Sequence, residues 1–331
     1  MEINLRPQTL GEILDRTAQL YRENFLLFAG IASVYAGILL VLSLLQIGMQ
    51  EVLRIRHMNS EVVWATLISM LVMWPVILIV GGFAVAANNR AVSWVHLGER
   101  ATIRAAYASI VPKLGRYLWL MVITTFMVWI PFALIYAAYA VFVILYAKPK
   151  GLFNQPPTIH NPEAVLIFAL VTAGFGVLVL GAIIYAILMG LRYSLAVPAS
   201  VIEDLPARKA IRRSIHLSKG SRGRIFLLAL LVVAIQVGLG LVTQLFFIVA
   251  TFRHHGDLPA GIRVVQQLVA FFTNAFVGPI YATGFTLFYY DQRVRKEGYD
   301  IEWMMRAAGM EQPAISTGTS LVPAHSEDPL V

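Results

Sequence analysis

The chain has 331 residues, of which 58% are hydrophobic and only 13% are charged, and its formal net charge at pH 7 is +8. Soluble domains carry about 25% charged residues, so this composition excludes an ordinary soluble globular protein. The mean hydropathy of +0.72 supports the same conclusion. Because the chain has no cysteine, disulfides, thiolate metal sites and cysteine nucleophiles are also excluded.

Six stretches of the chain are apolar and contain no Lys, Arg, Asp or Glu. They cover residues 25–48, 62–87, 117–147, 164–191, 225–252 and 264–290. A helix needs about 20 apolar residues to cross the hydrocarbon core of a bilayer, and every stretch is longer than that. A transmembrane β-strand would alternate apolar and polar residues, whereas residues 226–235 are continuously apolar. The sequence therefore predicts an all-α fold, a polytopic bundle of six transmembrane helices.

The basic residues that lie between these stretches are distributed unevenly. Segments 1–24, 88–116, 192–224 and 291–331 hold 20 of the 26 Lys and Arg residues. Cytoplasmic loops of membrane proteins are enriched in Lys and Arg, so both termini are predicted to be cytoplasmic. On that face we expect anionic lipids as partners, and we favour this interpretation of the basic residues over nucleic-acid binding.

Three segments, 9–23, 102–117 and 206–219, have the pattern of an amphipathic helix and each precedes an apolar stretch. Thr9 and Glu12 match a capping box, Thr102 suits an N-cap, Asp204 can cap the third helix, and Gly220 suits its end. The sequence thus predicts three hairpins, each preceded by a cytoplasmic interfacial helix. The alternative is that such connectors occur in any helical membrane protein.

These patterns divide the chain into three parts. Residues 1–24 are predicted to contain the first interfacial helix, residues 25–310 the six-helix transmembrane domain, and residues 311–331 a disordered cytoplasmic tail. The tail is rich in small and polar residues, a composition typical of disorder.

Four strings resemble a known family: LGEILDRTAQLYRENF, AVSWVHLG, RYSLAVPASVIEDLPARKAIRRSIHLSKG and YYDQRVRKEGYDIEWM. Together they resemble the bacterial membrane-protein family named for the membrane domain fused to some glycerophosphoryl diester phosphodiesterases. The resemblance spans residues 6 to about 306. It implies a six-helix protein of the bacterial inner membrane without an assigned reaction. Because the chain ends where the catalytic domain would begin, we expect only the membrane part.

The six apolar stretches offer little chemistry. They lack ionisable acidic and basic side chains, the usual markers of proton and ion pathways, and their polar residues include Thr124, Thr125, Gln236 and Gln244. Hydrogen bonding between helices is the favoured role for these residues. If a polar cavity exists, Gln236 and Gln244 are its best candidates. The chain lacks HExxH, GxxxxGK[ST] and GxSxG patterns, so no catalytic residue, metal or cofactor is predicted.

One group of charged residues near helix ends forms a candidate binding site. We hypothesise that Arg192, Glu203, Asp291 and Arg293 form a cytoplasmic ion-pair cluster that ties the hairpins together. The sequence from Tyr193 to Val201 remains mostly apolar, so the fourth helix is expected to continue past Arg192 and hold it at headgroup level. The alternative is that these charges are independently solvated and only mark topology.

These observations favour a non-enzymatic integral membrane protein. We expect a scaffold, a membrane-organising factor or a partner subunit, with a membrane or cytoplasmic protein as its partner. The alternative is a transporter or channel-like protein for a small or lipidic solute, which the repeats and the core glutamines weakly support. A lipid-modifying enzyme would need an acid, base or metal cluster, which only the region around Glu203 and Asp291 could supply.

Overall fold

The structure is a computed structural model that describes residues 6–55, 59–148, 162–253 and 258–307. Of these residues 91% are helical and none is in a strand, which confirms the predicted all-α fold. In chain order the helices are α1 (Leu10–Glu23), α2 (Phe25–Ile55), α3 (Asn59–His96), α4 (Ile103–Ile110), the 3-10 turn η1 (Val111–Lys113), α5 (Leu114–Phe142), the π-helical turn η2 (Val143–Ala147), α6 (Pro162–Tyr193), α7 (Ala196–Ile202), α8 (Ala207–Ser218), α9 (Arg222–Arg253), α10 (Ala260–Glu297) and α11 (Tyr299–Ala307). The predicted tail 311–331 lies outside the described residues.

Six helices are long and apolar enough to cross a membrane, namely α2, α3, α5, α6, α9 and α10. The chain is therefore a multi-pass membrane protein, as predicted. Several of these helices extend beyond the apolar stretches of the sequence. The clearest case is α3, which runs to His96 although its apolar stretch ends at residue 87.

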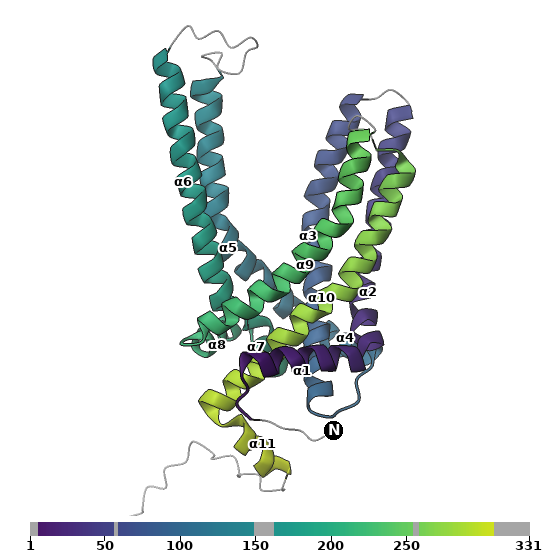
Figure 1. Ribbon diagram of the computed structural model, residues 1–331, viewed down its shortest axis with the longest axis vertical. Helices are drawn as coiled ribbons and strands as arrows, with labels where there is room; N and C mark the ends of the chain where they lie inside the picture. The colour runs from purple at the N-terminus through teal and green to yellow at the C-terminus, as the bar shows by residue number, and fades with distance from the viewer. Residues whose placement is uncertain (1–5, 56–58, 149–161, 254–257, 308–331) are drawn as a thin grey trace, which may run out of the picture.

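The six spans form two arms that meet at one end (Figure 1). One arm is the pair α5 and α6. The other contains α2, α3, α9 and α10, in which α10 packs against the other three. The arms diverge away from their common end, where α5 packs against α3. The bundle is thus closed at one end and open at the other.

The common end of the arms is covered by four short helices, α1, α4, α7 and α8, which together with the C-terminal end of α10 we call the platform. Figure 1 shows α1 lying across the ends of the spans. Helices α1, α4 and α8 directly precede the pairs α2–α3, α5–α6 and α9–α10. The predicted order of a short helix followed by a hairpin therefore occurs three times.

Two of the three predicted helix caps are present. The Thr9 hydroxyl accepts from the Glu12 N–H at 3.3 Å and the Glu12 carboxylate accepts from the Thr9 N–H at 2.6 Å, which completes the capping box. The Thr102 hydroxyl caps α4. Asp204 does not cap α8, so that prediction was wrong: its carboxylate accepts from Lys113 and Arg116 instead. The N-cap position of α8 is occupied by Pro206, two residues after Asp204.

The fourth span does not continue past Arg192 as expected, because α6 ends at Tyr193 and the chain turns before α7. Pro198 cannot donate a hydrogen bond to Ser194 in a continuing helix, and its ring would clash with the Ser194 carbonyl. The break is also bound by Ser214 on α8. Its hydroxyl donates to the Arg192 carbonyl at 2.9 Å and accepts from the Leu195 N–H at 3.2 Å. A continuing α-helix would use both backbone groups within itself, so the Ser214 side chain stabilises the break that Pro198 favours.

Large side chains are buried mainly at the platform end. The largest fully buried ones include Tyr117, Tyr289, Tyr290 and Phe28. The outer part of the α5–α6 arm, by contrast, leaves large apolar side chains such as Leu145 at 73% exposed. In a bilayer such surfaces contact lipid tails. The three hydrophobic clusters of the described residues all include side chains of the platform helices.

Candidate functional site on the platform

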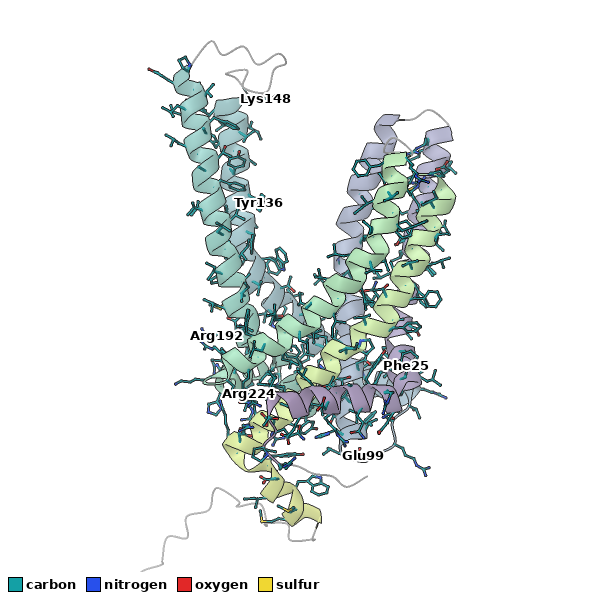
Figure 2. The ribbon with its side chains drawn as sticks, in the orientation of Figure 1. Phe25, Glu99, Tyr136, Lys148, Arg192 and Arg224 are labelled. Atoms are coloured by element: carbon teal, nitrogen blue, oxygen red, sulfur yellow. The ribbon has the colours of Figure 1, made fainter. Side chains whose placement is uncertain are left out.

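The charged side chains of the platform form three ionic clusters. Figure 2 shows Arg192, Arg224 and Glu99 at the platform end of the molecule, and Lys148 at the far end of the α5–α6 arm. We name each cluster after the carboxylate at its centre, as the Glu203 cluster, the Asp291 cluster and the Asp204 cluster.

The Glu203 cluster joins α8 to α10. Arg213 on α8 donates to the Glu203 carboxylate at 2.9 Å and to the Glu297 carboxylate at 2.7 Å. Arg293 on α10 lies 3.7 Å from Glu203 and 3.2 Å from Glu297, and the Tyr289 hydroxyl also donates to Glu203. Burial opposes ionisation of Arg213, but the hydrogen bonds to Glu297 and Glu203 outweigh it and raise the pKa of this guanidinium above its usual value.

The Asp291 cluster joins the N-terminal segment to α9 and α10. The Asp291 side chain is only 1% exposed and accepts from the Gln8 N–H at 2.8 Å, from Arg224 at 3.1 Å and from Arg295 at 3.0 Å. Arg224 and Arg295 also donate to the Gln8 carbonyl. A carboxylate so deeply buried is stable only because these donors replace its water. The segment before α1 is thereby held against two spans.

The structure divides the predicted cluster of Arg192, Glu203, Asp291 and Arg293. Glu203 and Arg293 do lie together. Asp291 belongs to the separate Asp291 cluster, because two residues along α10 separate it from Arg293 by about 200° around the helix. Arg192 makes no ion pair with a carboxylate of the described chain, and its buried Nε has no hydrogen-bond partner. The predicted membership was therefore wrong for Asp291 and Arg192.

Sequence reasoning missed several cluster residues. Two of them carry a signal, since Arg295 lies four residues after Asp291 and Glu297 four residues after Arg293, the spacing of ion pairs on a helix surface. Arg213 lies on α8 and Arg224 on α9, whereas Glu297 and Asp291 lie on α10. Spacing along the sequence therefore could not predict these two pairs.

A line of buried polar residues between α3 and α10 was also missed. The Ser93 and Tyr290 hydroxyls lie 2.7 Å apart, and the Thr286 hydroxyl donates to the side-chain oxygen Oδ1 of Asn89 at 3.0 Å. The neighbouring Asn88 is 3% exposed and its Oδ1 has no hydrogen-bond partner among the described residues. The signal was the absence of a helix breaker after residue 87, which predicts that α3 continues.

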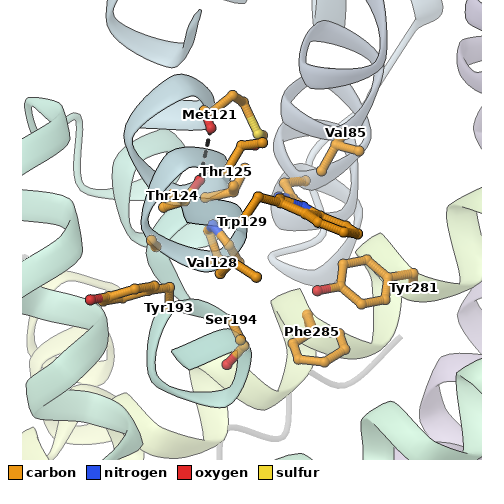
Figure 3. A pocket seen from close by; sticks show the side chains of 15 residues that line it. Val85, Met121, Thr124, Thr125, Val128, Trp129, Tyr193, Ser194, Tyr281 and Phe285 are labelled. Carbon is orange, nitrogen blue, oxygen red and sulfur yellow. Dashed lines mark hydrogen bonds between the residues drawn. The ribbon is translucent and has the colours of Figure 1, made fainter. Parts of the chain in front are cut away.

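A cavity of about 330 Å³ lies where the two arms meet. In Figure 3, Tyr281 and Phe285 of α10 face Thr124 and Trp129 of α5 across the opening. The full lining is Val85, Asn89, Met121, Thr124, Thr125, Val128, Trp129, Gly190, Tyr193, Ser194, Ala196, Val197, Pro198, Tyr281 and Phe285. A mostly apolar lining with a few hydroxyls, at the small end of the usual range for ligand pockets, suits one apolar chain.

The glutamines of α9 do not contribute to this cavity. Its lining contains no α9 residue. Gln236 and Gln244 were candidates for a polar cavity, and the lining of this cavity is mostly apolar. Gln244 instead accepts from Gln266 of α10 at 3.2 Å, the interhelical hydrogen bonding that was favoured for these residues. Thr124 and Thr125 do line the cavity, and Thr124 donates to backbone carbonyls of its own helix.

The chemistry of the three clusters is structural. Each central carboxylate accepts from at least one Arg, and the one at Asp291 is almost inaccessible to solvent. Within the described residues, no group of three or more His, Asp or Glu side chains is arranged to hold a metal ion. The arrangement can hold helices against one another. Exposed Lys and Arg side chains that have no carboxylate partner leave positive charge on the surface.

Compared with known proteins, the chain matches no family model, no curated protein and no solved structure.

We expect Asp291→Ala to lower the free energy of unfolding by about 3 kcal/mol, since truncating a buried carboxylate leaves its Arg partners unpaired. Breaking a buried ion pair typically costs about 3–5 kcal/mol. We expect the lower value because Arg295 is 36% exposed and water can solvate it. Asp15→Ala, at an exposed position of α1, is the control and should change stability by less than about 0.5 kcal/mol. Unfolding in detergent micelles measures both, and equal losses would contradict this role of Asp291.

The Asp204 cluster predicts a pH dependence of stability. Hydrogen bonds from Lys113 and then Arg116 lower the pKa of the Asp204 carboxyl below its ordinary value of 3.8. The resulting stabilisation is present above that value and is lost as the pH falls through the lower folded-state pKa. Asp204 has φ +59, a conformation that Asn also tolerates.

Asp204→Asn should therefore keep the backbone and remove only the ionisable group. We expect the wild-type chain to melt at a higher temperature than this variant near pH 6, with the difference shrinking below about pH 4. Because Asp204 is half exposed, the effect is modest. A difference that stayed constant down to the lowest pH measured would show that it does not arise from ionisation.

Proposed function

We propose that this protein is a non-enzymatic membrane scaffold that binds a protein partner through α11. The platform lies on the cytoplasmic side of a bacterial inner membrane in this proposal, with both termini in the cytoplasm. The concentration of Lys and Arg in the segments at that end supports this orientation. The resemblance to the membrane domain named for glycerophosphoryl diester phosphodiesterases supports the bacterial location.

The observation that carries the proposal is the exposure of α11. Ile301 and Met304 on this helix are 57% and 55% exposed, and Figure 1 shows α11 extending from the platform away from the spans. Large apolar side chains that project from the side opposite the spans are not explained by contact with lipid. Such side chains, methionines in particular, are typical of protein-binding surfaces.

The Glu203 cluster fixes the start of this helix. Gly298 adopts φ +65, a left-handed conformation that ends α10 and redirects the chain. The guanidinium of Arg293 then lies 4.0 Å from the centre of the Tyr299 ring, and Tyr299 also packs against Tyr290. Because Arg293 pairs with Glu203 and Glu297, the scaffold holds the docking helix in a defined position.

The proposal is tested by recovering the full-length chain from native membranes and quantifying the proteins bound to it. Ile301→Ser with Met304→Ser should reduce recovery of the partner at least fivefold, since an exposed apolar contact typically contributes about 1 kcal/mol or more. Val111→Ser is the matched control, because Val111 is 58% exposed outside α11. If the double variant and the control recover the same proteins in the same amounts, α11 is not the docking helix.

The cavity between the arms favours a second candidate, transport of a lipidic solute. Gly190 and Gly181 both lie on α6, and a Cβ atom added at either would meet no other atom within 4 Å. Only Gly190 lines the cavity. If the protein transports, Gly190→Leu should slow the exchange of a fluorescent phospholipid between the leaflets of proteoliposomes, and Gly181→Leu should not. Wild-type exchange no faster than in protein-free vesicles would remove this candidate.

A further inference from the structure

The helix α8 has two faces of opposite character. One face is buried against the rest of the platform and consists of Ala207, Ala210, Ile211, Ser214, Leu217 and Ser218. The opposite face carries the exposed cations Arg208, Lys209 and Arg212, and Lys219 follows the helix. At about 100° per residue these four positions fall within about 100° of one another. Helix α8 contains no acidic residue.

Nearby carboxylates do not neutralise this face. Glu203 and Glu297 bind Arg213, which lies at the edge of α8, and they also pair with Arg293. No ion pair joins the four outward cations to a carboxylate within the part of the chain that the structure describes. The carboxylates of Glu203 and Glu297 are thus occupied by Arg213 and Arg293 and do not pair with the outward cations of α8.

The C-terminal end of α8 is compensated in a different way. The Lys296 ammonium donates to the carbonyls of His216 at 3.0 Å, Leu217 at 2.9 Å and Lys219 at 2.6 Å. A helix C-terminus carries partial negative charge, and Lys296 satisfies it. The same three bonds hold α8 in place, so its outward cations are presented on a fixed helix.

The corresponding helices of the other two hairpins lack such a face. The helix α1 mixes Asp15 and Glu23 with Arg16 and Arg22, and α4 carries Arg104 as its sole charged residue. A basic residue before each hairpin would be enough to set topology. The additional cations of α8 therefore need an explanation beyond topology.

The position of α8 indicates which anion can reach it. Three residues separate Ser218 from Arg222, where the span α9 begins, and α8 also packs against the span α6. A shallow hollow beside the cations is bounded by Glu203, Leu205, Lys209, Arg212, Arg213 and His216. At the level where a span enters the bilayer, the abundant anion is the phosphate of a lipid headgroup.

We propose that the outward face of α8 is a binding site for the headgroup phosphate of an anionic phospholipid. Arg and Lys side chains bind phosphate by charge-assisted hydrogen bonds. A zwitterionic headgroup carries its own ammonium group, which competes with the protein cations for the lipid phosphate. The site therefore prefers lipids whose headgroup has no ammonium group beside the phosphate. The site depends on the placement of α8 and not on the docking role of α11.

The test compares two variants of the full chain that each lose three exposed cations. One is Arg208→Gln with Lys209→Gln and Arg212→Gln on α8. The control is Arg22→Gln with Arg100→Gln and Arg104→Gln, which lie elsewhere on or beside the platform. Both are assembled in nanodiscs of equal parts phosphatidylglycerol and phosphatidylcholine, and the lipids that remain bound after release are counted by native mass spectrometry.

The wild-type chain should retain phosphatidylglycerol in preference to phosphatidylcholine, and the α8 variant should lose that preference by tenfold or more, since each cation near a charged surface contributes to lipid binding. The control should change it less than about threefold, because its cations are not grouped on one face. Arg208→Lys with Arg212→Lys, which retains the charge, should keep the preference. Equal retention by the α8 variant and the control would overturn the proposal.

Two further measurements identify the source of the phosphate. The wild-type chain is purified in detergent without lipid, and either inorganic phosphate or phosphatidylglycerol is then added. Inorganic phosphate should raise the melting temperature less than phosphatidylglycerol does. An equal rise would assign the site to a soluble phosphate compound and overturn the lipid proposal. A single-stranded RNA that displaced phosphatidylglycerol from the wild-type chain but not from the α8 variant would overturn it in favour of nucleic acid. Size-exclusion profiles confirm that each variant is folded.

Discussion

Inside a bilayer no hydrophobic force drives apolar helices together, because lipid tails are as apolar as the helices themselves. The spans of this protein are therefore held by van der Waals packing and by polar contacts. Most of the ionic contacts lie at the platform end, and Arg263 of α10 pairs with Glu51 of α2 at the opposite end. The Asp291 carboxylate on α10 accepts from Arg224 of α9 and from Arg295 of α10 itself. Arg213 of α8 donates to Glu297 on α10 and to Glu203, which follows α7. Away from these contacts the arms diverge (Figure 1).

The same contacts decide where charge remains at the surface. In the Glu203 cluster the partly buried Arg213 and Arg293 bind the two nearby carboxylates, Glu203 and Glu297. Burial makes an unpaired charge costly. Arg213 and Arg293 are paired, whereas the outward cations of α8 are exposed to solvent and lipid. The exposed face of α8 and the fixed start of α11 are thus two consequences of the Glu203 cluster.

Local features of this fold were predictable from sequence, and features that depend on contacts between distant segments were not. The capping box of Thr9 and the cap of Thr102 each involve neighbouring residues. Asp204 is not a cap because Pro206 occupies the N-cap position of α8. Its carboxylate instead binds Lys113 and Arg116, about 90 residues away in the chain. At the break after Tyr193, Pro198 is a local signal in the sequence, whereas the two backbone hydrogen bonds of the Ser214 hydroxyl depend on where α8 packs.

The sequence alone indicated that the protein lies in a lipid bilayer and how many spans it has. It also predicted the helix that precedes each hairpin and the end of the bundle where most charged residues lie. Apolar length and the position of charge are properties of single segments, and lipid acts on each segment separately. Only the tertiary structure decided that Asp291 and Arg293 belong to different clusters, that the spans form two arms, and that the outward cations of α8 lie away from the carboxylates that bind Arg213. Those outcomes depend on which helices meet, and a side chain can satisfy only the groups that the fold brings within hydrogen-bond distance.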